Sequence, residues 1–153
     1  MQKNKQKSLR ILISYYGLLQ SLHLIALIRA GVLMLSGTPS PFPLLPPPDG
    51  WEVQTLPFLF GLGGTDVVGI ILGILFAYWA VVKGNYQRLT GLISLTIFIT
   101  GAIVFGAGTF PSGAWAAHPI AYWSMVILFI PAPILYILML KQKDITQAYT
   151  TQK

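Results

Sequence analysis

The chain has 153 residues, of which 54% are hydrophobic and only 9% are charged, and its net charge is +6. In soluble domains roughly a quarter of all residues are charged. This composition and a mean hydropathy of +0.67 therefore exclude an ordinary soluble fold and indicate a membrane protein. The chain contains no cysteine, which excludes disulfides, thiol catalysis and cysteine-based metal sites. Its basic residues lie at the ends of apolar segments and form no single surface, so we expect no nucleic-acid partner.

Four apolar segments follow one another along the chain, each long enough to cross a bilayer as a helix: residues 11–35, 58–82, 89–108 and 120–140. The first follows a basic polar tail and is too long for the apolar part of a signal peptide. A loop that holds seven of the eleven prolines precedes the second, and the short sequence KGNYQR predicts a tight hairpin between the second and the third. Pro131 and Pro133 predict a bend in the fourth segment. We therefore predict an all-α integral membrane protein, one four-transmembrane-helix bundle over residues 1–153.

Lysine and arginine are distributed unevenly between the two sides of this predicted bundle. The amino-terminal tail, the 83–88 turn and the carboxy-terminal tail hold nine basic residues, whereas the two opposite loops hold none. Basic loops stay on the cytoplasmic side of a membrane. We expect a multi-pass protein of the cell membrane with both termini in the cytoplasm.

Two charged side chains lie inside the apolar segments, Arg29 in the first and Asp66 in the second. A charge at such a depth is costly and marks a functional-site hypothesis. Counted along the helices at 1.5 Å per residue, the two residues are nearly level, and each charge would be strongly unfavourable alone. We therefore predict that they form an ion pair. Two roles remain open, a lock between the first two helices and a site for a ligand or a proton.

Helical spacing predicts which faces pack together. Small residues share one face of the second segment with the carboxylate: Asp66, Gly69, Gly73, Ala77 and Ala80. A second small-residue seam follows the third segment: Ser94, Gly101 and Gly108. Such faces allow membrane helices to approach closely, so we expect Asp66 to point into the bundle.

The candidate site follows from this orientation. Tyr16, Gln20 and His23 share one face of the first helix. We predict a cavity that opens to the outside and is lined by four candidate ligand-binding or proton-exchange residues, with Trp51 or Trp115 near its mouth. The four residues are Arg29, Asp66, Thr65 and His23. The sequence shows no metal-binding motif, nucleophile elbow or phosphate loop, so we expect no metal and no cofactor.

The order of features resembles the DoxX-like group of small four-helix membrane proteins. The resemblance rests on R-A-G at Arg29 to Gly31, on a loop rich in proline, on D-V-V-G at Asp66 to Gly69, and on the basic turn into the third helix. Asp66 stands where members of that group often carry glutamate. The resemblance implies a membrane subunit of a kind sometimes linked to quinone-coupled redox chemistry, and it identifies no substrate.

Three functions are compatible with the sequence. An accessory or scaffold subunit of a membrane assembly, with another membrane protein or a second copy as partner, accounts for the small size and the small-residue seams. A binding protein or enzyme for a lipid or quinone would use the Arg29 and Asp66 pocket, with a proton exchanged at Asp66 or His23. A proton-coupled transporter would need alternating access, and the chain shows no internal repeat. We rank the three in this order.

Overall fold

The computed structural model describes residues 2–36 and 51–141, except for the side chains of residues 2–5, 34, 51–60 and 112. The elements in chain order are α1 (Gln2–Leu35), α2 (Trp51–Val81), α3 (Arg88–Thr109), the 3₁₀ turn η1 (Phe110–Ser112), α4 (Ala114–Ala117), α5 (Pro119–Phe129) and α6 (Pro131–Lys141). This described part is all-helical and contains no strand. Four stretches are long and apolar enough to cross a membrane: Gln6–Leu33, Gly61–Val81, Arg88–Thr109 and Pro119–Lys141. The prediction of an all-α chain with four spans is therefore confirmed.

Two helices begin earlier than the sequence predicted. α1 begins at Gln2 instead of residue 11, and α2 begins at Trp51 instead of residue 58. The amino-terminal tail is polar but contains neither glycine nor proline, so nothing in it stops a helix once the apolar segment has formed one. Residues 51–56 likewise lack both residue types, and the helix continues through the proline at position 57, which costs a backbone hydrogen bond and a clash with the preceding turn. The proline-rich loop itself lies outside the described residues.

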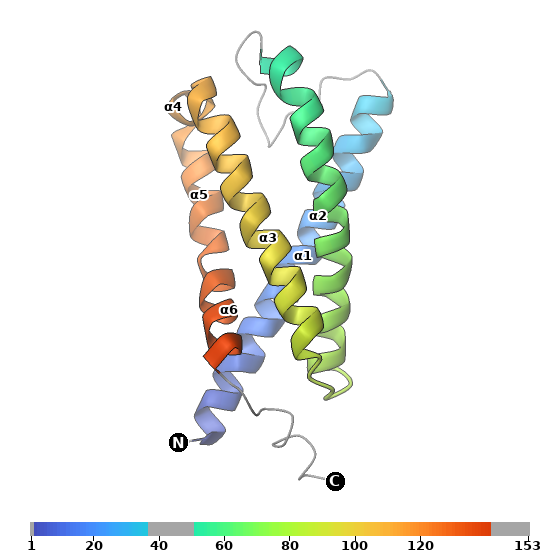
Figure 1. Ribbon diagram of the computed structural model, residues 1–153, viewed down its shortest axis with the longest axis vertical. Helices are drawn as coiled ribbons and strands as arrows, with labels where there is room; N and C mark the ends of the chain where they lie inside the picture. Colours follow the sequence, from blue (N-terminus) through green and yellow to red (C-terminus); the bar gives the residue numbers. More distant parts are fainter. Residues whose placement is uncertain (1, 37–50, 142–153) are drawn as a thin grey trace.

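The helices form a bundle whose two ends differ (Figure 1). One end holds the start of α1, the α2–α3 turn and the end of α6, together with Lys7, Arg10, Lys83, Arg88 and Lys141; we refer to it as the basic end. The other, which we refer to as the opposite end, holds the end of α1 and the short helix α4. α2 packs against both α1 and α3, and α6 packs against α1 and α3.

The predicted hairpin between the second and third spans is confirmed. Gly84 adopts a φ of 65°, which is readily accessible only to glycine. This conformation lets the backbone N–H of Asn85 donate to the carbonyl of Trp79 over 2.9 Å. The last carbonyls of α2 are thereby satisfied as the chain reverses, as at many helix ends.

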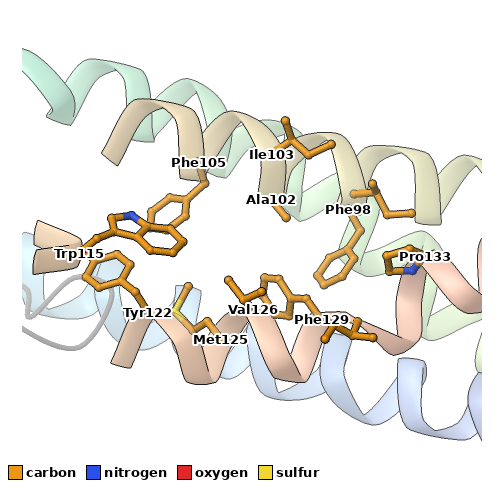
Figure 2. A pocket seen from close by; sticks show the side chains of 12 residues that line it. Phe98, Ala102, Ile103, Phe105, Trp115, Tyr122, Met125, Val126, Phe129 and Pro133 are labelled. Carbon is orange, nitrogen blue, oxygen red and sulfur yellow. The ribbon is translucent and has the colours of Figure 1, made fainter. Parts of the chain in front are cut away.

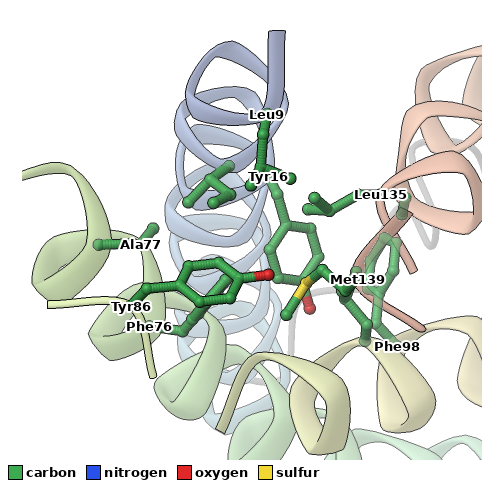
Figure 3. Packing of buried hydrophobic residues seen from close by; sticks show 12 residues of the cluster. Leu9, Tyr16, Phe76, Ala77, Tyr86, Phe98, Leu135 and Met139 are labelled. Carbon is green, nitrogen blue, oxygen red and sulfur yellow. The ribbon is translucent and has the colours of Figure 1, made fainter. Parts of the chain in front are cut away.

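The hydrophobic core lies in the half of the bundle nearer the basic end (Figure 3). It is built from all four spans: Leu9, Ile13, Tyr16, Phe76, Ala77, Ala80, Tyr86, Leu95, Phe98, Ala132, Leu135 and Met139. Aromatic rings interlock within it; the rings of Tyr16 and Phe98 meet edge to face at 5.7 Å, and those of Phe98 and Phe129 at 4.8 Å. Such pairs add to the packing energy of a core. We refer to the twelve buried residues as the core cluster.

Two arginines tie helix ends together at the basic end. Arg10 of α1 donates to the carbonyl of Val81, the last residue of α2. Arg88 of α3 donates to the carbonyls of Met139 (3.0 Å) and Leu140 (3.3 Å) at the end of α6. The last carbonyls of a helix lack partners within it and carry partial negative charge, so a guanidinium stabilises them. These bonds link neighbouring spans across their ends.

Small residues allow the helices to approach closely, as the sequence predicted. Gly69, Gly73, Ala77 and Ala80 of α2 are buried. A Cβ added at Gly73 would lie 2.8 Å from Ser94 Oγ of α3 and 2.9 Å from Gln20 Cγ of α1. The seam of α3 is confirmed at Ser94 and Gly101, which are buried. It is wrong at Gly108, which is exposed because α3 has left α2 at that level.

The bend predicted in the fourth span is confirmed as a break at Ile130, between α5 and α6. Pro131 has no N–H to continue the helix. The break leaves carbonyls of α5 for other donors, and the hydroxyl of Tyr15 on α1 donates to the carbonyl of Leu128 over 2.8 Å. It also separates α6, which packs on α1 and α3, from α5, whose contact with α3 is slight.

Candidate functional site

Asp66 lies inside the bundle, on the face of α2 that the sequence predicted. Its side chain is half-buried, and a Cβ added at Gly101 would lie 2.7 Å from its Oδ1. The carboxylate therefore rests against the backbone of α3. A side chain at position 101 would force the carboxylate to move.

Arg29 does not pair with Asp66, and that prediction was wrong. Arg29 follows the buried Gln20 by nine residues, which at 100° per residue places it about 180° around α1. Its side chain is accordingly exposed on the side of α1 that faces away from the bundle. Within the described residues no ion pair joins it to Asp66. Similar depth along two helices was thus not enough, because the two side chains point in different directions.

The other two candidates differ in what their polar groups contact. The side chain of Thr65 is exposed, and its hydroxyl donates to the carbonyl of Leu62 over 2.7 Å, so its proton is already bound within α2. His23 is half-buried, and its ring meets that of Phe98 edge to face at 6.3 Å. The Nδ1 atom of His23 is buried and has no hydrogen-bond partner among the residues that the structure describes.

A chain of hydrogen bonds lies more than one helical turn from His23, on the side of the basic end. The hydroxyl of Ser94 donates to the carbonyl of Gly69 over 2.7 Å, so the hydroxyl of Tyr16, 2.7 Å from Ser94 Oγ, is the donor to Ser94. Both side chains are buried. Beside them Gln20 is fully buried with its amide near the Tyr16 hydroxyl, yet neither its Nε2 nor its Oε1 makes a hydrogen bond of good geometry within residues 2–36 and 51–141 as described.

Gln20, His23 and Asp66 form what we refer to as the interior polar strip. Close approach of Gly17 to Ala77 and of Gln20 to Gly73 fixes the register of α1 against α2. Continued along the antiparallel pair, this register places Asp66 level with residues 27 and 28 of α1, about one turn beyond His23. The strip therefore leads from the middle of the bundle toward the opposite end.

A separate cavity of about 440 Å³ lies between α3 on one side and α5 and α6 on the other (Figure 2). Phe98 and Pro133 mark one end of it, and Trp115 and Tyr122 mark the other. Its lining is almost wholly apolar. We refer to it as the apolar slot. It lies where α5 stays apart from α3, over the half nearer the opposite end.

The end of the slot is built by the segment between α3 and α5. Trp115 of α4 stacks on Tyr122 of α5 at 5.0 Å, and Tyr122 stacks on Phe105 of α3 at 6.3 Å. The indole N–H of Trp115 donates to Thr109 Oγ1 over 2.9 Å, which fixes the ring over the end of α3. Trp115 therefore closes the slot and presents no free polar group to it.

The slot is not the cavity that the sequence predicted. Of the residues named for that cavity, Trp115 lines the slot, whereas Arg29, Asp66, Thr65 and His23 do not. The side chain of Trp51 lies outside the described residues. A ligand-binding or proton-exchange role for the four candidates stays a prediction.

The sequence analysis placed Trp115 near the mouth of a different cavity and did not predict the slot. A signal was present: Phe98 and Phe105 are seven residues apart on α3, and Tyr122 and Phe129 are seven apart on α5. This spacing places each pair on one helix face. Two facing aromatic pairs hold helices apart wherever their rings do not interdigitate.

Among the described residues, no three His, Asp or Glu side chains are grouped so that they could hold a metal ion. Comparison of the chain with protein-family models, with curated proteins and with solved structures found no match. The resemblance to the DoxX-like group therefore stays a prediction.

Proposed function

We propose that this protein spans the cell membrane four times, with its basic end in the cytoplasm. Four apolar spans and the placement of nine basic residues on one side support this orientation. Asn85 lies in the α2–α3 turn and Ala116 in α4, and both are exposed. Cysteine placed at Ala116 should react with an impermeant thiol reagent in intact cells, and cysteine at Asn85 should react only after lysis. Labelling of position 85 in intact cells would reverse the orientation.

We further propose that the protein binds the hydrocarbon chain of a lipid-like molecule. The observation that carries this proposal is the apolar slot, whose volume of about 440 Å³ lies within the range of small-molecule sites. Its lining offers no hydrogen-bonding group along its length except at the Trp115 and Tyr122 end. An apolar chain is therefore the complementary occupant, with its polar end beyond the aromatic rings, nearer the water.

The dimensions of the slot favour a single chain over a helix of a partner protein. Seven residues separate Phe98 from Phe105 and eleven separate Tyr122 from Pro133, so the slot is about 10–16 Å long at 1.5 Å per residue. Its volume of about 440 Å³ then gives a mean cross-section of about 30–40 Å². A helix with its side chains is about 10–12 Å wide and needs roughly 80–110 Å². The slot is too narrow for a helix.

Native mass spectrometry in mild detergent tests this proposal. Ala102 lines the slot from α3, whereas Ala107 of the same helix is exposed and does not line it. Ala102→Trp should fill the slot and abolish a retained lipid adduct, and Ala107→Trp should leave the adduct in place. Met125→Trp fills the same space from α5, should Ala102→Trp fail to fold. Equal lipid retention by all variants would overturn the proposal.

The second candidate function is that of an accessory subunit of a membrane assembly, and Arg29 is the observation that favours it. Its guanidinium is exposed on the outward side of α1, near the end of a span. An acidic group of a partner chain would stabilise it there, although a lipid phosphate reached by snorkelling would do the same. The same mass spectra distinguish the two: a partner chain lost in Arg29→Gln supports the subunit, and a lipid alone does not.

A further inference from the structure

Buried polar atoms in the middle of the bundle have no hydrogen-bond partner of good geometry within the part of the chain that the structure describes. Gln20 is 0% exposed, and both atoms of its amide, like Nδ1 of His23, are unpartnered among the residues described. A buried amide without hydrogen bonds is strongly unfavourable, more so where no water surrounds the helices. Native structures satisfy such groups with a bound ligand or with ordered water.

These atoms lie on one path, the interior polar strip. His23 follows Gln20 by three residues on the same face of α1, and Asp66 lies about one turn farther toward the opposite end. Between Gln20 and the basic end, the Tyr16–Ser94 hydrogen bond and the core cluster close the path. Gln20 is buried, whereas His23 and Asp66 are only half-buried. The path is thus closed toward the basic end and partly exposed toward the opposite end.

We propose that the interior polar strip is a proton-exchange site that is hydrated from the opposite end and closed toward the basic end. Water is the occupant that fits, because it both donates and accepts, as the amide of Gln20, the imidazole of His23 and the carboxylate of Asp66 require. Asp66 takes a proton from hydronium in the adjacent water and becomes a neutral carboxylic acid. Through a bridging water it gives a proton to Nδ1 of His23, which becomes imidazolium while the carboxylate is restored.

The surroundings of the strip hold few competing charges. On the interior face of α1 the titratable side chains are Tyr16 and His23, and Arg29 points away. α3 carries no Asp, Glu, Lys, Arg or His from Leu89 to Thr109. The span of α2 carries no other acid or base between Gly61 and Val81, apart from the exposed Tyr78. Proton binding at the strip is therefore a property of Asp66 and His23. It does not depend on occupancy of the apolar slot.

Carbodiimide labelling tests access to the site. A water-soluble carbodiimide modifies a protonated carboxyl, so it is added to sealed vesicles on the side of the opposite end, with Glu52 as the reference carboxyl. Modification of Asp66, read by peptide mass spectrometry, should rise several-fold as the pH on that side is lowered from mildly alkaline to mildly acidic. A change of pH on the basic side alone should have no effect. The proposal is overturned if Asp66 stays unmodified at every pH while Glu52 reacts, or if only the pH on the basic side matters.

The sign of a stability change tests hydration independently of labelling. If water satisfies the amide of Gln20, Gln20→Met removes hydrogen bonds and should lower the midpoint of thermal unfolding by about 2–4 °C. If the amide is dry, the same change removes an unsatisfied polar group and should raise the midpoint. Leu19→Met, one position earlier and half-buried, reports the cost of introducing methionine alone. A midpoint for Gln20→Met at or above that of Leu19→Met would overturn the proposal.

Discussion

Glycine has different surroundings in the two halves of the bundle. In the half near the basic end, glycine faces other helices directly: a Cβ at Gly91 would lie 2.7 Å from both Phe76 and Met139, and one at Gly17 would overlap Ala77. Toward the opposite end the last such contact is at Gly101, where a Cβ would lie 2.7 Å from Asp66 Oδ1, whereas a Cβ at Gly31 or Gly64 meets no described atom within 4 Å. Glycine thus brings helices together only where a neighbouring helix is already directed toward it.

The difference locates the features that could bind a ligand. α2 and α3 lie close together at the basic end and separate toward the opposite end (Figure 1). The apolar slot and the Asp66 end of the interior polar strip lie in that half. Binding sites tend to occupy the less tightly packed parts of a protein, because a site needs space and some freedom to move. The closely packed half then serves as the support that fixes the helices on which these groups lie.

The largest effect should come from adding one methyl group to α1 in each half. Gly17→Ala places a Cβ against that of Ala77 and must push α1 away from α2, which should destabilise the protein by about 1–3 kcal/mol. Gly31→Ala meets open space and should stabilise α1 by about 0.5–1 kcal/mol through its helix propensity. Denaturation followed by circular dichroism in detergent measures both. Similar values for the two variants would mean that the halves are packed alike.

A smaller effect is expected at the helix ends of the basic half. Arg88→Ala removes the two hydrogen bonds to the last carbonyls of α6 and should cost about 1.5 kcal/mol, the lower range for bonds that involve a charged group. Arg88→Lys keeps the charge but not the fork that reaches two carbonyls, so it should recover only part of the loss. If lysine restores full stability, charge near the helix end is sufficient and the hydrogen-bond geometry is irrelevant.

Patterns within single helices predicted much of the fold. Apolar length gave the four spans, Pro131 gave the break in the fourth, and the spacing of Gly69, Gly73 and Ala77 gave the packed face of α2. Each of these is a property of one helix considered alone. The starts of α1 and α2 were wrong because polar or proline-flanked residues extend a helix once an apolar segment has nucleated it.

The site was predicted less well, because it depends on how helices lie relative to one another. The inward direction of Asp66 followed from its own helix, but its contact with Gly101 required the register of α2 against α3. The apolar slot depends on the separation of α5 from α3; the sevenfold aromatic spacing within each helix places the rings on one face but does not give that separation. Arg29 illustrates the same limit, since its depth was estimated without the direction of its side chain.

The smallest expected effect is a coupling free energy of nearly zero between Arg29 and Asp66. It separates most sharply the ion pair predicted from the sequence from the arrangement in the structure. A buried ion pair would make each single neutralisation costly, by about 3–5 kcal/mol, and the double variant would recover much of that loss. In the structure Arg29 is exposed on the outer side of α1 while Asp66 lies against α3. Arg29→Gln should therefore not lower the stability of the chain, because it removes a costly charge from a span and no contact with the bundle. Asp66→Asn should not lower stability, because it removes a half-buried charge that has no cationic partner within the described chain. The double variant should equal the sum of the two single variants within about 0.5 kcal/mol. A coupling of several kcal/mol would instead show that the two side chains meet in the folded protein, and that α1 is rotated relative to the arrangement described here.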